Sequence, residues 1–184
     1  MHRFKKVFTF TIAGLGVLSF ITALSPLALA QTTQTVQEPR CTIGLARITT
    51  LLEGVVTTTE AHTKTYTQWQ DTIAATITRA ADRGFDTGTL EVAQSEIDSK
   101  VKTFTEKASS YTAALTTVQN TACGESEEAY TTALTTARTA LAEVRTATTE
   151  TKAAFIDKAK PALTTYANWL LEQLNENPEQ GPST

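Results

Sequence analysis

The sequence predicts an all-α protein: an up-down-up antiparallel three-helix bundle, or coiled coil, with one disulfide, placed after an N-terminal signal segment. Three observations support this fold class. Apolar residues recur alternately four and three positions apart along three stretches, which is the spacing of a single helical stripe. Gly84 and Gly124 interrupt the pattern twice, where the chain can reverse. Two cysteines, Cys41 and Cys123, lie at the ends of neighbouring stretches.

The breaks between the stretches carry the residues that end and begin helices. Gly84 tolerates the left-handed backbone that closes a helix, and Asp86 can cap the helix that follows. Ser126 can cap the third helix, and the glutamates beside it favour the positive end of the helix dipole. The expected helices span about 41–83, 87–122 and 126–174.

A proline inside the third helix predicts a kink or break at Lys160-Pro161. An internal proline removes a hydrogen bond and costs about 3 kcal/mol where the helix must continue. Counting residues places Pro161 level with the Gly84 turn, so residues 162–174 would project beyond the bundle or fold across its end. The bundle as a whole is expected at 40–174, between a flexible leader at 31–39 and a disordered tail at 175–184.

Residues 1–30 have the layout of a secretory signal peptide. A basic start is followed by the apolar stretch Val7–Leu24 and by small residues that end at Ala30. An uncleaved membrane anchor is the alternative, because the apolar stretch is only just long enough to span a bilayer, for which about 20 residues are needed. We expect cleavage after Ala30 and an exported protein, located outside the cell, in a periplasm or at the cell surface. Membrane contact is expected only through this segment, if it is not cleaved.

The two cysteines are expected to form one disulfide, because an even count in an exported chain indicates pairing. Reversing the chain at Gly84 brings Cys41 and Cys123 to the same end, with an axial mismatch of about 6 Å at ~1.5 Å rise per residue. In the chain-entropy model, closing such a loop contributes roughly 4–5 kcal/mol.

Composition excludes several function classes. The formal net charge is −3, and it becomes −6 without residues 1–30, which hold three Lys or Arg and no acidic residue. No nucleic acid is expected as a partner, because such binding requires clustered Lys and Arg. No cofactor or metal is expected either, since the mature chain has a single histidine and no Glu-x-x-His pattern. No catalytic set can be assigned, so we do not expect an enzyme.

His62 lies on the apolar stripe of the first helix. It is expected to be a core histidine bonded to Thr59 or to the backbone, and the alternative is a ligand-binding residue or a pH switch. The antiparallel register also places Tyr66 near Phe104. Trp69 is expected to face the small residues Thr148 and Thr151, and a small cavity near Thr148 is the alternative.

Threonine makes up about a fifth of the chain, although it is a poor helix former. We interpret the threonines as a neutral polar coat. Sugar attachment is the alternative, but mucin-like tracts also carry proline and lack heptads.

The end of the third helix carries more bulky apolar residues than a lone extension needs. If it folds onto Phe85 it caps the core, and if it projects it forms an exposed apolar patch of the kind that contacts partners or membranes. The candidate interaction residues are Leu163, Tyr166, Trp169, Leu170, Leu171 and Leu174.

The chain carries several short motifs: Arg40-Cys41, Arg47-Ile48, Gly84-Phe85-Asp86-Thr87, Leu90, Tyr111, Cys123 and Arg138. These motifs resemble those of small exported helical proteins from uncultivated candidate-phylum bacteria. The resemblance covers most of 40–161 and implies the disulfide and the first turn, but no activity and no binding residues. The expected three-helix topology is also similar to that of a spectrin-type unit, by analogy only.

Taken together, these features favour a non-enzymatic structural or protein-interaction protein of the cell envelope or exterior. Its end segment would contact a protein partner or a second copy of the chain. One alternative is a binding module, either a holdase or a small-ligand carrier, with a cleft near His62 or Thr148. The other is a membrane-active bundle whose helices open.

Overall fold

The computed structural model describes residues 37–123 and 126–176. These residues belong to one compact unit, Val36–Thr184. The expected signal peptide at 1–30, residues 31–36 of the expected leader and residues 177–184 of the expected tail lie outside the described residues.

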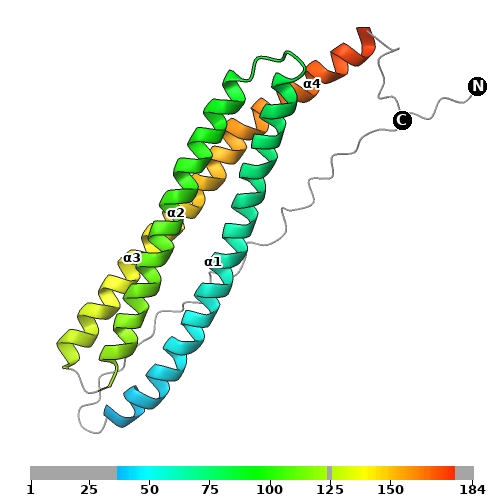
Figure 1. The fold of residues 1–184 in the computed structure, drawn as a ribbon. Coiled ribbons are helices and arrows are strands. Elements are labelled where there is room, and N and C mark those ends of the chain that lie inside the picture. Colours follow the sequence, from blue (N-terminus) through cyan, green and yellow to red (C-terminus); the bar gives the residue numbers. More distant parts are fainter. Residues whose placement is uncertain (1–36, 124–125, 177–184) are drawn as a thin grey trace, which may run out of the picture. The chain divides into compact units, whose positions relative to one another are not determined.

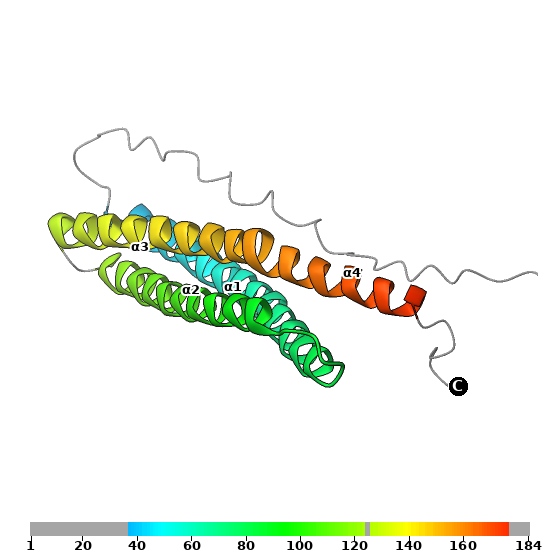
Figure 2. The same ribbon diagram turned by 90° about the horizontal axis from the view of Figure 1, so that it is seen from above.

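Every regular element in the described part of the chain is a helix, which confirms the all-α class (Figure 1). Three long α-helices are followed by one π-helical turn and a fourth α-helix, which continues the direction of the third (Figure 2). The elements are α1 (Gln37–Ala81), α2 (Gly88–Thr121), α3 (Glu127–Ala154), the π-helix η1 (Phe155–Ala159) and α4 (Lys160–Glu176).

Two helix ends correct the expected boundaries. α1 begins at Gln37, so residues 37–39 are helical and do not belong to a flexible leader. Pro39 is accepted there because a first-turn residue has no helical partner for its backbone N–H. α4 ends at Glu176, so residues 175 and 176, expected in the disordered tail, are also helical.

The turn between α1 and α2 has the predicted left-handed glycine, but the N-cap residue of α2 is Thr87 and not Asp86. Gly84 has a φ of 77°. The N–H of Gly84 donates to Ala81 and that of Phe85 donates to Ala80, both at 3.0 Å, which closes α1 at Ala81 rather than at 83. The Asp86 carboxylate accepts the Gly88 N–H at 3.0 Å, so α2 begins at Gly88 rather than at 87.

The start of α3 is capped by Ser126, as predicted. Its hydroxyl oxygen accepts the Ala129 N–H at 3.1 Å. Glu127 and Glu128 occupy the first turn, where their charge is favourable to the helix dipole.

α1 and α2 run in opposite directions. The Gln119 amide donates to the Thr49 hydroxyl at 3.1 Å, and the Gln70 amide donates to the Asp98 carboxylate at 2.7 Å. Along α1 the residue number rises from 49 to 70, while the residue number of the partner on α2 falls from 119 to 98. The two helices are therefore antiparallel.

α2 and α3 are antiparallel by the same reasoning. Lys107 pairs with Glu143 at 3.0 Å, and Lys100 pairs with Glu150 at 2.9 Å. Exposed ion pairs of this kind add little to stability, so their main value is to define the register of the two helices.

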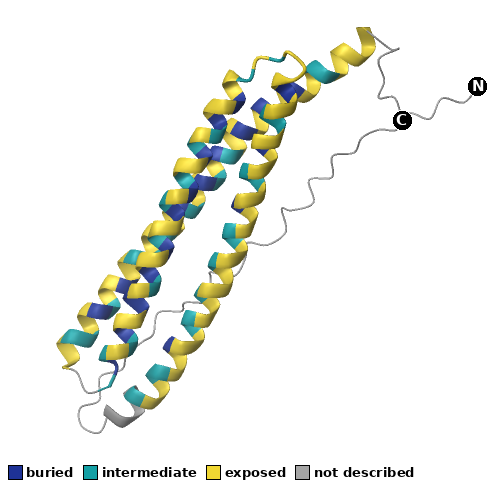
Figure 3. Ribbon diagram, in the orientation of Figure 1, coloured by how far each residue is buried: buried dark blue, intermediate teal, exposed yellow. Residues whose placement is uncertain are grey.

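The core consists of three apolar clusters that follow one another along the helices, visible in Figure 3 as buried positions on the facing sides. α2 contributes most, with ten buried residues at heptad spacing. The middle cluster surrounds Tyr66 and Phe104. The second surrounds Ile48 and Leu115 near the disulfide, and the third surrounds Leu90 and Tyr166 near the α1–α2 turn.

The expected kink or break at Lys160-Pro161 is replaced by the π-helical turn η1, and the chain stays helical through Pro161. The Lys160 N–H donates to the Phe155 carbonyl, five residues earlier. A π-turn widens the helix just before the proline, where the ring would otherwise meet the carbonyl of residue 157. The proline therefore changes the helix type upstream instead of ending the helix.

The disulfide joins the start of α1 to the residue that follows the end of α2. Cys41 and Cys123 are bonded, with 4.8 Å between their Cα atoms, which confirms the predicted pairing. The bond spans 82 residues. In the chain-entropy model a loop of that size contributes roughly 4–5 kcal/mol to stability.

Two glycines with equally open surroundings should respond oppositely to alanine. Neither Gly84 nor Gly54 has any atom within 4 Å of an added Cβ. Gly84→Ala should lower the free energy of unfolding by about 1–2 kcal/mol, because its backbone is left-handed. Gly54→Ala should raise it by about 1 kcal/mol, because alanine favours a helix interior. Urea denaturation followed by circular dichroism measures both, and equal effects of one sign would contradict this account.

Candidate functional site

The predicted end segment is divided between core and surface. Ala162 and Tyr166 are buried in one cluster with Ala80 and Leu90. This part of α4 caps the core, as one of the two interpretations expected. The last two turns continue past the α1–α2 turn (Figure 1). They match the other interpretation, an apolar projection.

The ring of Phe85 seats α4 on the turn. Its centroid lies 5.2 Å from that of Tyr166 and 5.3 Å from that of Trp169. Beyond this contact Leu171 is 59% exposed and Leu174 is 49% exposed. The six candidate residues are therefore distributed as Tyr166 buried; Leu163, Trp169 and Leu170 half-buried; and Leu171 and Leu174 exposed.

Leu170, Leu171 and Leu174 form what we call the α4 end patch. Residues three and four apart are neighbours on a helix surface, so Leu174 lies beside both other leucines. The last turn of α4 has no basic residue, and two acidic residues, Glu172 and Glu176, lie in its last two turns. The carboxylates add to the negative end of the helix dipole, so the patch lies at an electronegative end.

A cluster of five rings occupies the middle of the bundle. His62 stacks on Tyr66, and Phe104 meets both rings edge to face at 5.7 and 5.1 Å. The predicted contact between Tyr66 and Phe104 is thus confirmed. Trp69 stacks on Phe155 with 4.2 Å between centroids, so a large ring packs on it where small residues were expected.

His62 is half-buried beside the core rather than within it. Its ring contacts the rings of Tyr66 and Phe104, and within the described residues it has neither the expected hydrogen bond to Thr59 or to the backbone nor a carboxylate partner. Burial lowers the pKa of His62 below its usual 6.5, and the nearby Lys152 lowers it further. Burial also lowers the pKa of Lys152. Burial and the Lys152 charge therefore both disfavour the charged form of His62.

Tyr66 is 1% exposed and carries a polar group into the core. Burial raises the pKa of its hydroxyl to about 12, while the neighbouring Thr148 hydroxyl opposes that shift. The Thr148 hydroxyl itself donates to the Val144 carbonyl at 2.8 Å. The Tyr66 hydroxyl makes no hydrogen bond of ordinary geometry within the described residues. A buried hydroxyl without a hydrogen bond costs stability.

The threonine coat bonds mostly to its own helices. The hydroxyl of Thr57 donates to the Glu53 carbonyl at 3.0 Å, and that of Thr135 donates to the Thr131 carbonyl at 3.0 Å. The same four-residue pattern recurs on all the α-helices of the described chain. These donors are satisfied locally, which fits a neutral coat better than an array of donors for a ligand.

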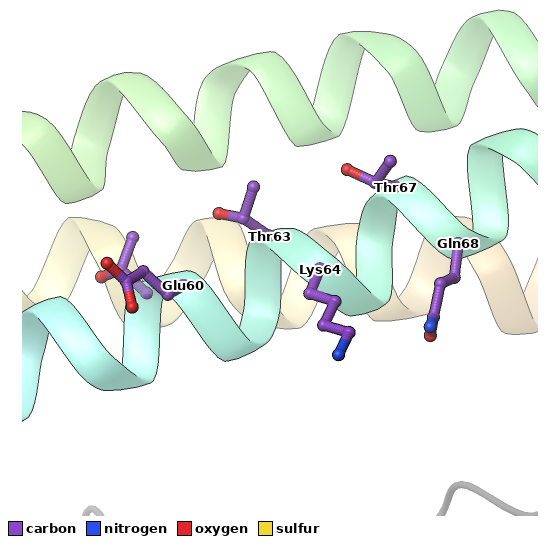
Figure 4. Close-up of a pocket in the computed structure, with 6 residues that line it drawn as sticks. Glu60, Thr63, Lys64, Thr67 and Gln68 are labelled. Atoms are coloured by element: carbon purple, nitrogen blue, oxygen red, sulfur yellow. The ribbon is translucent and has the colours of Figure 1, made fainter.

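Two surface hollows lie within this coat. The one in Figure 4 has a volume of about 530 Å³, and all its lining residues belong to α1. Thr63 and Thr67 point to the side of α2, while Lys64 and Gln68 point away (Figure 4). A second hollow, of about 520 Å³, lies between α2 and the start of α3. Both are open depressions, and neither is lined by His62 or Thr148.

In residues 37–123 and 126–176, no three His, Cys, Asp or Glu side chains gather as a metal site would require. Among the helices of those ranges, none is long and apolar enough to span a bilayer.

Comparisons of the chain with protein-family models, with curated proteins and with the solved structures found no match. The geometry of the described residues therefore carries the functional argument. Its two candidate features are the α4 end patch and the ring cluster around His62.

The lowered pKa of His62 predicts a pH dependence of stability. The unfolded chain takes up a proton near pH 6.5 and the folded chain only at lower pH, so protonation favours unfolding. The His62 contribution is present above pH 6.5 and is lost as the pH falls through the lowered pKa of the folded state. His62→Phe should reduce the loss of unfolding free energy between pH 7.5 and pH 5, measured by urea denaturation. An unchanged loss would show that His62 titrates normally.

Proposed function

We propose that the chain is a non-enzymatic, exported helical protein that binds another protein through the α4 end patch. The supporting observation is the exposure of Leu171 and Leu174 on a helix whose preceding turns are anchored in the core. Monomeric proteins rarely project contiguous bulky apolar side chains, and such surfaces usually mark contacts. Ala162 and Tyr166 hold the helix, so the patch is presented on a rigid support.

Export and bundle topology belong to the same proposal. The disulfide supports an oxidising location, because such bonds persist mainly outside the reducing cytosol. Residues 1–30 then act as the signal segment, and the mature protein works outside the cell, in a periplasm or at the cell surface. We propose an up-down-up arrangement of α1, α2 and α3 in solution, supported by the antiparallel cross-helix pairs.

The chemistry of the patch suggests what it binds. Three leucines offer a small apolar surface, and the end of α4 is electronegative through Glu172 and Glu176. The best match is an apolar surface or helix flanked by Lys or Arg, on a different protein or on a second copy. Attraction to such a partner should weaken with salt, because exposed charges are screened.

Replacing Leu171 and Leu174 together by serine should weaken binding at least about tenfold, since burial of one leucine is worth about 1.5–3 kcal/mol. Helical content and stability should hardly change, because both side chains are exposed. Sedimentation analysis measures self-association, and capture from the native cell surface measures a different partner.

Val92→Ser is the matched control, because Val92 is an equally apolar side chain, 66% exposed, on α2. It should bind like the unmodified protein. Truncation after Lys160 is a poorer test, since it also removes Ala162 and Tyr166 from the core. If the leucine variant and the valine control bind equally well in both assays, the proposed role of α4 is wrong.

A further inference from the structure

The first half of α1 is held far more weakly than the second half. We call residues 41–58 the α1 arm. Ile48 is the arm's only buried side chain, and the next one along α1 is Tyr66. The second half is anchored by Tyr66, Ile73 and Ala80, all at most 1% exposed.

The arm is also a poor helix on its own. It contains two internal glycines, Gly44 and Gly54, each of which costs about 1 kcal/mol relative to alanine. Ile43 and Val56 are 53% and 44% exposed, so these side chains contribute little burial. Isolated helices of about 12–15 residues are marginal in water. The arm therefore depends on what it packs against and on the bond at its end.

Beneath the arm lies an apolar face of α2 and α3, which we call the covered face. Ile48 belongs to the same buried cluster, and four half-buried residues of the arm pack on it: Leu45, Leu51, Leu52 and Val55. Besides the disulfide, the Gln119 amide donates to the Thr49 hydroxyl at 3.1 Å and so links α2 to the arm at its exposed edge. The covered face consists of Tyr111, Ala114, Leu115, Val118, Ala133 and Ala137.

The disulfide ends the arm and is within reach of reagents. Cys41 and Cys123 are both half-buried, not enclosed. A dithiol reductant can attack one sulfur as its thiolate, forming a mixed disulfide and releasing the other cysteine. Its second thiol then displaces the remaining cysteine, so the reductant becomes a disulfide and the protein gains two thiols. Two electrons and two protons pass from the reductant to the protein.

We propose that the Cys41–Cys123 disulfide is a redox latch on the arm. Intact, it keeps the arm over the covered face; reduced by a dithiol, it lets the arm detach locally while the rest of the bundle stays folded. The opened face then accepts an amphipathic helix of a partner. That occupant follows from the present one, because the arm itself fills the face with apolar residues at positions 45, 48, 52 and 55. The latch is independent of the proposed role of α4, which lies at the opposite end of the bundle (Figure 1).

Hydrogen exchange of the purified protein, with and without a dithiol, tests the latch. Reduction should speed exchange of the amides of 44–58 at least about tenfold, because local opening becomes accessible. The amides of 66–80 should exchange as before. Cys41→Ser combined with Cys123→Ser should reproduce the reduced pattern without a reductant, and adding reductant to this variant should change nothing further.

A fluorescent peptide of residues 42–58 tests the occupant. It should bind the reduced protein and not the oxidised one, and the same peptide with Ile48→Asp and Leu52→Asp should bind neither. Equal protection of the arm in both redox states overturns the latch, as does joint loss of protection in 44–58 and 66–80. An open arm without peptide binding, or with binding only to phosphatidylglycerol vesicles, overturns the helical partner.

Discussion

Burial of the apolar stripe of α2 is the interaction on which the rest of the structure depends. Its ten buried residues run from Leu90 to Val118 at heptad spacing, and every core cluster contains some of them. Heptad spacing keeps such a stripe facing its neighbours along the whole length of the helix. α1 and α3 hold their places because each packs on this stripe. The threonines outside it satisfy their hydroxyls within their own helices and add little between helices.

The contacts of α2 with α1 (the α1 seam) and with α3 (the α3 seam) are not equally well packed. The redox latch that we propose depends on this difference. The α3 seam has two cross-helix ion pairs and small buried residues such as Ala137 and Ala147. In the α1 seam, Ile48 is the only buried side chain among residues 41–58 of α1. The Cys41–Cys123 disulfide lies at the end of this weaker seam, where it contributes most to holding α1 on α2. Stability is therefore uneven along the molecule, which is the condition for local opening without unfolding.

Much of this fold is readable from the sequence because its signals are local. Heptad spacing predicts the helices, Gly84 predicts the first break and Ser126 the cap of the third helix. The meeting of the two cysteines follows from the chain reversal at Gly84. The stacking of Trp69 on Phe155 could not be predicted in this way, because it depends on how two side chains from distant parts of the sequence are oriented.

The candidate site was readable only in part. An excess of bulky apolar residues after Pro161 identifies the segment, but its division between core and surface depends on where Phe85 lies. Local spacing cannot give that position, because it is set by the packing of two elements distant in sequence. The sequence therefore identifies the six candidate residues as one group, and only the structure shows which of them cap the core and which belong to the α4 end patch.

The π-turn determines which residues of α4 face the core. The last buried positions of α3, Ala147, Thr151 and Ala154, are four and three apart, and the next buried position is Ala159, five residues on. The regular spacing then resumes at Ala162 and Tyr166. One added residue rotates everything that follows by about 100°, since an α-helix has 3.6 residues per turn. Without that rotation Lys158 and Thr165 would face the core in place of Ala159 and Tyr166.

The added residue is also visible in the spacing of the sequence. The stripe positions 151, 155 and 159 are separated by two successive steps of four, where heptad spacing alternates four and three. Pro161 favours the widened turn, so the residue expected to end the helix instead seats Tyr166 in the core, and the end patch depends on that anchor.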